Sequence, residues 1–361
     1  MTGAVLSYAD RQAYVAGLDG LLPRKPMLTM QQEFARSDAW VDWKGAHYTV
    51  RQEWDAHAHE TCTCTFHMKH AHAHAHETCT CTCQVRQEWA YVTGRAHTRE
   101  RCTPGTRDAT HDGKTVEQFV SEVNGFIHER REKGHGTLLP EASAFLTTDE
   151  VLAVRLYSGP AYQPINTFLR QIASLNADFR SRVARDPALT FAATCRHIAA
   201  AIRKLAAVAT PEELVAPLYR GLRGSLKKGF WIRDEMGMVV ACDTAFMSTS
   251  RNRQTPIHYM GPGDNVLWEL RTKPESDAGF HRGADISMLS QFAGEDEVLF
   301  PPCTMLTVRH ADEASAASTV RKASLAERED LLLPEVHTLQ VELRAEQGKQ
   351  FLCVGVQPSF V

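Results

Sequence analysis

The sequence lacks a strong excess of charge, a long apolar run and a glycine-rich dinucleotide motif, and each absence excludes a class of function. Its 361 residues carry a formal net charge of −3, so no global field attracts nucleic acid or acidic lipid. No stretch approaches the roughly 20 apolar residues that a membrane helix needs. No GxGxxG sequence follows a predicted strand, which disfavours a Rossmann fold. We therefore expect no nucleic acid and no membrane among the partners.

A secretory signal is also missing, because residues 1–20 contain no basic segment followed by a continuous apolar run. We therefore expect a cytoplasmic protein. The ten cysteines do not suggest a disulfide framework, since five lie in one biased segment and five are scattered singly. We interpret the scattered ones as buried or free thiols: Cys102, Cys195, Cys242, Cys303 and Cys353.

Residues 54–84 form a low-complexity segment that holds seven of the 17 histidines and five of the ten cysteines. The sequence HAHETCTCT occurs in it twice, and VRQEW flanks it on both sides. Thiolate and imidazole groups suit zinc or copper(I). The Cys-Thr-Cys and His-Ala-His spacing nevertheless lacks the two-residue gap of zinc knuckles, and few apolar residues surround it. We favour a duplicated insertion in a disordered loop, and we expect no metal requirement.

Helical patterns come first along the chain. Capping-box patterns begin helices after Thr115 and Thr147, and the sequence SGP at 158–160 ends the second one. Amphipathic patterns predict two more helices, at 165–175 and 189–209. Residues 1–50 carry no recognisable motif, and residues 90–113 have the polar, turn-rich composition of a loop.

After Pro211 the pattern changes to short β-prone runs between turn residues. These runs predict strands at 218–220, 238–242, 245–250, 265–270, 297–300, 305–309, 338–343 and 351–356. Helices followed by strands indicate an α+β fold, in which a helical layer packs on a two-sheet antiparallel core.

Three short features follow one another in the strand-rich part. Arg220 ends a short apolar strand, Ser248 lies in the sequence AFMSTS, and Glu295 and Glu297 lie in the sequence GEDEVLFPP. Each alone is ordinary: an arginine at a strand end, a Ser-Thr-Ser strand and an exposed Glu-x-Glu loop are common.

In this order and spacing, the features resemble the arginine-serine-glutamate class of mono-ADP-ribosyltransferases. That class includes vertebrate arginine-specific enzymes and binary actin-modifying toxins. The segments LYRGL, AFMSTSRN, NVLWEL, GADISMLSQF and GEDEVLFPP follow the order of the family's strands and loops. Upstream, a helical signature contains Tyr157, Tyr162, Asn166, Leu169 and Arg170. The similarity covers residues 145–357, and it implies a catalytic domain at 145–361 after an N-terminal region, 1–144, of unknown role.

The resemblance implies NAD as the substrate and assigns the site residues. Glu297 would stabilise the positive charge that develops on the nicotinamide ribose. Arg220 would bind the pyrophosphate with its planar fork. The Gly221 backbone would hold the carboxamide, since glycine permits close approach. Ser248 would orient Glu297 or the ribose, while the two residues after it support the strands.

Glu295 at the earlier position goes with an arginine acceptor in this family, so a protein carrying that arginine is the implied partner. Its side chain points the same way as that of Glu297 if the segment is extended, which turns Asp296 away. Phe292 sits where the family often has an aromatic residue that shapes acceptor choice, although it could equally pack on the core. We expect His258 and His281 at the surface.

Two other functions stay open. The same site acts as an NAD glycohydrolase if water captures the ribosyl cation. The histidine- and cysteine-rich segment could instead serve a metal-binding interaction protein with an inactive transferase scaffold. The intact arginine, serine and glutamate motifs favour an enzyme. The oligomeric state and the target protein do not follow from the sequence.

Overall fold

The computed structural model describes residues 26–35, 111, 113–136, 139–174, 177–226, 228–231, 238–273, 281–309 and 340–359. The histidine- and cysteine-rich segment at 54–84 lies outside these residues, as do most of the residues expected to form a loop at 90–113. In the described part, helices precede strands along the chain. The predicted α+β class is therefore confirmed.

The four predicted helices are present, and the two with capping boxes begin where the sequence predicts, whereas the helix Ala177–Arg185 was not predicted. Thr115 and Thr147 each accept a hydrogen bond from the backbone of the third helical residue, whose side chain bonds back to the cap. These two capping boxes satisfy donors that a helix start leaves unpaired. The helices are α2 (Met30–Ala35), α6 (Val116–Glu132), α7 (Glu141–Ala144), α8 (Thr148–Leu156), α9 (Tyr162–Ser174), α10 (Ala177–Arg185), α11 (Ala192–Ala207), α12 (Pro211–Val215) and α13 (Gln254–Tyr259).

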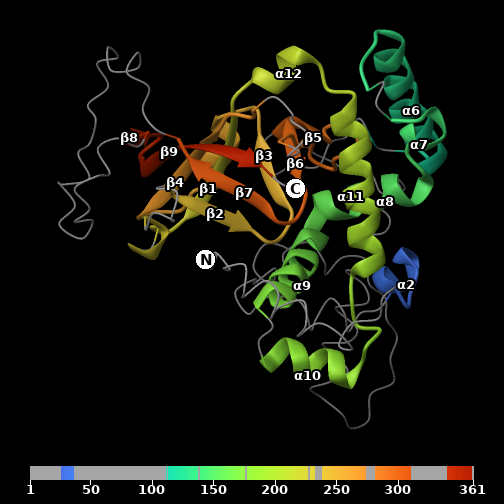
Figure 1. Ribbon diagram of the computed structural model, residues 1–361, viewed down its shortest axis with the longest axis horizontal. Coiled ribbons are helices and arrows are strands. Elements are labelled where there is room, and N and C mark those ends of the chain that lie inside the picture. The colour runs from blue at the N-terminus through green and yellow to red at the C-terminus, as the bar shows by residue number, and fades with distance from the viewer. Residues whose placement is uncertain are drawn as a thin grey trace, which may run out of the picture.

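The predicted break at 158–160 is a kink between two helices. A π-helical segment, η3 (Tyr157–Ala161), joins α8 to α9, and Gly159 in it has extended angles of φ −95° and ψ −165°. Pro160 has no N–H to continue the helix. The kink turns α9 into a new direction below α8 (Figure 1).

All eight predicted strands are present, with ends that differ by a few residues. The strands are β1 (Leu218–Arg223), β2 (Val240–Asp243), β3 (Met247–Ser250), β4 (Asn265–Leu270), β5 (Ala284–Asp285), β6 (Glu297–Phe300), β7 (Thr304–Val308), β8 (Val341–Glu346) and β9 (Lys349–Ser359). Among the strands of the described residues, only the two-residue strand β5 was not predicted, since it is too short to show an alternating pattern.

The strands form one mixed sheet, which corrects the expectation of two antiparallel sheets. The nine strands follow the order β2-β7-β9-β4-β1-β3-β6-β5, with β8 beside β9, and β4 runs parallel to β9. The join between β1 and β3 is narrow, because it contains a single register pair, Tyr219↔Ser250. Periodicity predicts strands but not their partners, so neither this join nor the parallel pair was visible in the sequence.

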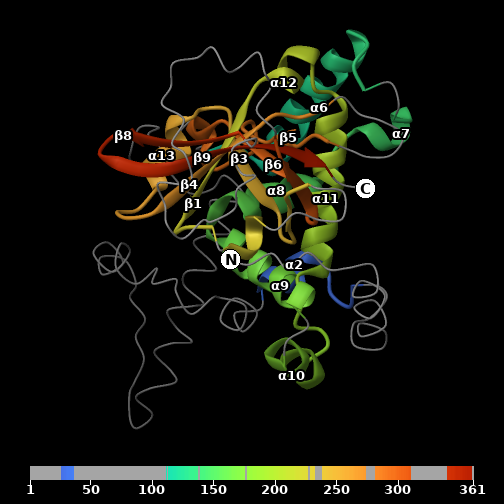
Figure 2. The same cartoon turned by 60° about the vertical axis from the view of Figure 1, so that its left-hand side comes forward.

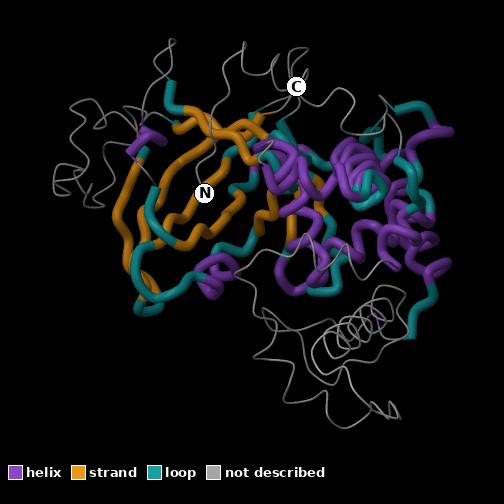
Figure 3. The backbone as a smooth tube through the Cα atoms, turned by 90° about the horizontal axis from the view of Figure 1, so that it is seen from below, coloured by secondary structure: helices purple, strands orange, loops and turns teal. Residues whose placement is uncertain are grey.

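Most helices lie on one side of the described structure and the strands on the other, while the short helix α13 packs on β1 and β3 (Figure 3). Helix α11 runs beside the β5 edge of the sheet, and α8 packs on α11 (Figure 1). One apolar cluster joins the helices to the β5–β6 edge, and it includes Phe119, Val154, Phe246 and Leu299. A fully buried side chain of this size contributes about 1.5–3 kcal/mol. The position of the sheet edge is therefore fixed by the helical layer.

Helix α2 shows that the N-terminal region packs on this layer too. Glu33 is fully buried, and its carboxyl accepts hydrogen bonds from the backbone N–H groups of Ala193 and Thr194, both at 2.9 Å. The Thr194 hydroxyl adds a third bond of 2.7 Å. Because the start of α11 has no side-chain cap of its own, Glu33 supplies the missing acceptor.

Candidate active site

Three adjacent strands, β1, β3 and β6, carry the predicted site residues. In the β3–β6 ladder Ser250 pairs with Glu297 and Ser248 pairs with Leu299. Ser248 and Glu297 therefore lie diagonally on the same face, because alternate residues of a strand share a face. The Ser248 side chain hydrogen-bonds the Glu297 carboxyl group. Strand pairing thus brings together two residues that are far apart in the chain.

The carboxyl group of Glu297 is buried, with 7% of the residue exposed. Burial raises its pKa to about 7, because the charged form loses its hydration. The charges of Glu295 and Asp285 also raise this pKa, whereas the Ser248 hydrogen bond and the Arg220 charge lower it. The group therefore changes charge near neutral pH, which is typical of catalytic carboxyls.

Two hydrogen-bond acceptors hold the Arg220 guanidinium close to Ser248 and Glu297. Its guanidinium donates to the backbone oxygen of Ser248 over 2.7 Å and to Asp243 Oδ2 over 3.2 Å. Asp243, at the end of β2, also lies 3.7 Å from the guanidinium of Arg170. An acid between two cations offsets their repulsion and orients both. Asp243 was missed because a lone aspartate before a strand carries no recognisable signal.

A cluster of buried polar groups connects helix α9 to the start of β3. Asn166 Nδ2 donates to the Tyr157 hydroxyl over 3.0 Å, and Asn166 Oδ1 accepts from the Phe246 N–H over 3.2 Å. The Tyr157 hydroxyl donates to the Phe246 oxygen over 3.3 Å. These buried bonds fix the strand that carries Ser248 to the helical layer, which gives the tyrosine and asparagine of the helical signature a positioning role.

Glu295 reaches the site by a turn rather than by an extended strand. It ends a 3₁₀ helix, η5 (Ala293–Glu295), and Asp296 then adopts the left-handed conformation with φ 48°. The expectation of an extended segment is therefore wrong. The Glu295 carboxyl is nonetheless close enough for its charge to raise the pKa of Glu297. Asp296 is exposed, as expected, but the turn rather than strand alternation directs it outward.

The two residues after Ser248 support the backbone, as predicted. The Thr249 hydroxyl donates to the Val298 oxygen over 2.7 Å, and the Ser250 hydroxyl donates to the Glu295 oxygen over 2.6 Å. Gly221 has a packing reason to be glycine, because a Cβ there would lie 3.0 Å from the Pro256 oxygen of α13. The close approach at Gly221 is therefore made by helix α13.

The two histidines differ from each other. His258 is exposed, as expected, although it lies in the last turn of α13 and not in a loop. His281 is buried, with 9% exposed, which corrects the expectation of a surface residue. No periodic pattern around His281 in the sequence indicated that it is buried. Phe292 is half-buried, and its N–H donates to Ser290 Oγ over 3.1 Å.

The loop before Glu295 is anchored to the end of α8. Arg155, which is 2% exposed, donates to the Leu289 oxygen over 2.9 Å. Gln291 Nε2 donates to the Arg155 oxygen over 2.9 Å, and the Gln291 N–H donates to Ser158 Oγ over 3.0 Å. A buried arginine inside an apolar helical run resembles a solvated position in the sequence, so this anchor was not predicted.

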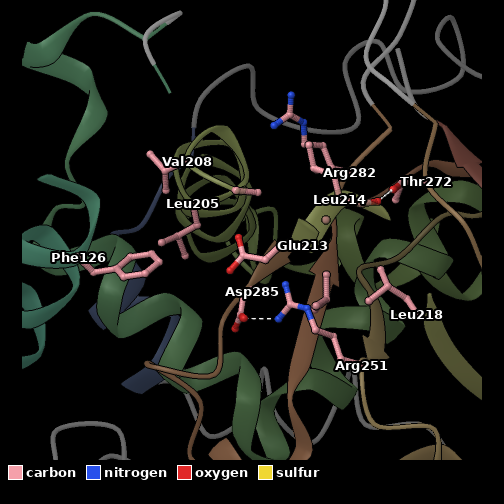
Figure 4. A pocket seen from close by; sticks show the side chains of 13 residues that line it. Phe126, Leu205, Val208, Glu213, Leu214, Leu218, Arg251, Thr272, Arg282 and Asp285 are labelled. Carbon is pink, nitrogen blue, oxygen red and sulfur yellow. Dashed lines mark hydrogen bonds and ion pairs between the residues drawn. The ribbon is translucent and has the colours of Figure 1, made fainter. Parts of the chain in front are cut away.

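A separate cavity lies between the helices and the sheet (Figure 4). Its lining includes Phe126, Glu213, Val298 and an ion pair between Arg251 and Asp285. Val298 follows Glu297 on β6, so alternation places this cavity on the opposite side of the strand from the Glu297 carboxyl. The cavity is therefore distinct from the cluster of Arg220, Ser248 and Glu297.

Within the described ranges, no group of three or more metal-ligating side chains comes together. In the same part of the chain, no helix is both long enough and apolar enough to span a bilayer. At the candidate site, Arg220, Ser248 and Glu297 together provide charged and hydrogen-bonding groups.

A family model matches more than half of the chain. The family model described as ADP-ribosyltransferase exoenzyme matches residues 136–332. A search of curated proteins finds no match.

Several solved structures are similar to this chain at low identity. The Vis toxin of Vibrio splendidus is 18% identical, over 65% of this chain and 85% of its own, with a TM-score of 0.36. HopU1 of Pseudomonas syringae pv. tomato is 19% identical, over 76% and 97%, with a TM-score of 0.37. The effector XopAI of Xanthomonas axonopodis pv. citri is 13% identical, over 99% and 94%, with a TM-score of 0.39.

Proposed function

Because the chain belongs to the ADP-ribosyltransferase exoenzyme family, we propose that it transfers ADP-ribose from NAD to an arginine side chain of a protein. Transfer of ADP-ribose is the family activity, while the arginine acceptor and the residue roles are our proposal. The observation that supports it most strongly is the meeting of the Arg220 guanidinium, Ser248 and the buried Glu297 carboxyl on three adjacent strands.

Glu297 would act on the bond between the nicotinamide nitrogen and the ribose. When this bond breaks, its electron pair goes to the nicotinamide, which leaves neutral, and the positive charge moves to the ribose. An ionised carboxylate beside the ribose stabilises that charge, and the effect is strong because burial limits solvent screening. The cationic nicotinamide ring of bound NAD also favours the ionised form of Glu297.

Arg220 would bind the pyrophosphate. A guanidinium is permanently charged and offers parallel donors to phosphate oxygens. Asp243 and the Ser248 oxygen hold its orientation before the substrate arrives, which lowers the cost of ordering it on binding. The backbone of Gly221, next in the chain, would contact the carboxamide.

Glu295 would receive the acceptor. A carboxylate pairs with a guanidinium in two parallel hydrogen bonds, and it can accept the proton that the attacking nitrogen loses. The new bond joins this nitrogen to the ribose, and the reaction releases nicotinamide and one proton. If water attacks in place of the guanidinium, the same site produces free ADP-ribose.

The test is incubation with NAD labelled in its ADP-ribose part, with and without agmatine, a small guanidinium compound. We expect label on agmatine with the wild-type protein and neither transfer nor hydrolysis with Glu297→Ala. Glu295→Ala should lose transfer and keep some hydrolysis. Free ADP-ribose as the sole product of the wild type would favour a glycohydrolase, and equal activity in all three proteins would contradict the assignment.

A further inference from the structure

Tyr259 holds the carboxyl group of Glu295, although no sequence pattern pointed to it. Its hydroxyl donates to Glu295 Oε1 over 2.5 Å. The tyrosine is the last residue of α13, a short helix that contacts β1 and β3 of the sheet (Figure 2). It is 41% exposed, so an acceptor arriving from solution can reach the pair that it forms with Glu295.

The backbone of Tyr259 is fixed by cations from two strands. Arg223 Nε of β1 donates to the Tyr259 oxygen over 3.0 Å. Lys349 Nζ of β9 donates to the oxygens of Ile257 and His258 over 2.8 Å and 2.7 Å. These cations bond to carbonyl oxygens in the last turn of the helix, where the helix dipole favours positive charge. The sheet therefore fixes the position of Tyr259, and Tyr259 holds the turn that carries Glu295.

The phenol acts as a donor and not as a base. Burial and the bond to Glu295 both raise the pKa of Tyr259, so its proton stays in place at neutral pH. A donor on one carboxylate oxygen fixes the plane of the group. Since a carboxylate offers about four acceptor positions on its two oxygens, this bond is compatible with simultaneous binding of a guanidinium.

We propose that Tyr259 is a positioning residue that orients the Glu295 carboxylate toward a guanidinium acceptor, and so sets the rate of transfer without setting the rate of NAD cleavage. This inference rests on the proposed function of the site. It separates the two activities because Tyr259 bonds to Glu295, whereas the Glu297 carboxyl is held by Ser248 and the Arg220 charge.

The test uses Tyr259→Phe, which removes one oxygen and keeps the ring. Acceptor-free NAD hydrolysis and agmatine-dependent transfer are measured at saturating NAD. We expect kcat/KM for agmatine to fall about tenfold, as for the loss of a charge-assisted hydrogen bond, and hydrolysis to stay within about twofold. The control is His258→Ala, which removes the exposed ring 5.4 Å from that of Tyr259 and should change neither rate.

A double-variant cycle distinguishes orientation of Glu295 from a general structural effect. In a Glu295→Gln background, Tyr259→Phe should cause no further loss of transfer, because both changes remove the same oriented carboxylate. Additive losses, an equal fall of hydrolysis and transfer, or unchanged or faster transfer in Tyr259→Phe would each overturn the inference.

A spectroscopic titration detects the bond without any turnover. The absorbance change of ionising tyrosines should show one group whose pKa falls in Glu295→Gln, and that group should be missing in Tyr259→Phe. If no tyrosine responds to Glu295→Gln, the inference is wrong. Absence of NAD turnover in the wild type would instead contradict the proposed function alone.

Discussion

Strand β6 and the turn η5 before it carry two glutamates that are two residues apart but have different surroundings. Glu297 is buried in a strand with neighbours on both sides, β3 and β5. Glu295 is half-buried at the end of a 3₁₀ helix and bonds to Tyr259. Asp296, with its positive φ of 48°, separates the two environments.

This difference suggests that the two carboxyl groups act in different steps of the reaction. A carboxyl fixed in a sheet and removed from water suits a step that is common to every reaction of the site, the cleavage of NAD. A carboxyl on a partly exposed turn suits contact with the acceptor, which differs from one target to another. The two carboxyl groups should therefore respond differently to substitution and to pH.

After the effect on the catalytic rate, the largest expected effect of replacing these glutamates is on the free energy of unfolding. Burial raises the pKa of Glu297 from 4.5 to about 7, so the folded protein holds a proton that the unfolded chain releases. Stability is therefore lost between pH 4.5 and pH 7, by roughly 3 kcal/mol in total. Glu297→Gln should remove this loss, and urea unfolding at pH 4.5 and pH 8 measures it.

In that experiment Glu295→Gln is the matched control, because it neutralises a half-exposed carboxyl on the neighbouring turn. It should keep most of the loss of stability between the two pH values, because Glu297 is still present. If the two variants gained equal stability at pH 8, the two glutamates would not differ in burial as the structure indicates.

A smaller effect is expected from Ser248→Ala. The serine hydrogen bond lowers the pKa of Glu297, so its loss leaves less of the ionised form at pH 7. Acceptor-free NAD hydrolysis should fall about tenfold at pH 7 and recover part of this loss at pH 9. Thr249→Val, which removes a hydroxyl bonded to the Val298 oxygen, should leave the pH dependence unchanged. A pH-independent deficit in Ser248→Ala would rule out this electrostatic role.

The smallest expected effect is that of the Glu295 charge on the pKa of Glu297. The charge of Glu295 raises the pKa of Glu297, so Glu295→Gln should move the acidic limb of the hydrolysis profile to lower pH. At pH 6 we expect a gain of about two- to threefold over the wild type. An unchanged profile would mean that Glu295 is too distant from Glu297, or too well screened, to act on it, and a shift to higher pH would contradict the sign of the effect.

Much of this architecture could be predicted from local patterns. Capping boxes at Thr115 and Thr147 predicted helix starts because their hydrogen bonds involve residues three apart. Residues 265–270 and 297–300 predicted β4 and β6 because β-prone runs between turns are local signals. The motifs of the proposed NAD site were visible for the same reason, since each occupies a few consecutive residues.

The remaining features depend on contacts between distant segments. The single register pair between β1 and β3 and the burial of Arg155 and His281 arise from tertiary packing. Asp243 bridges Arg220 and Arg170 from a third element. Asp296 adopts the left-handed conformation, for which local preference favours glycine or asparagine. The prediction of an extended segment failed at this residue.

The most direct test of the account is the rate of nicotinamide release from NAD at pH 8 without an acceptor. For Glu297→Gln we predict a fall of about a thousandfold, the size expected when an oriented charge is removed from a developing cation. For Glu295→Gln we predict a rate within about threefold of the wild type. Similar losses in both variants, or an active Glu297→Gln protein, would contradict the claim that the buried strand carboxyl alone drives NAD cleavage.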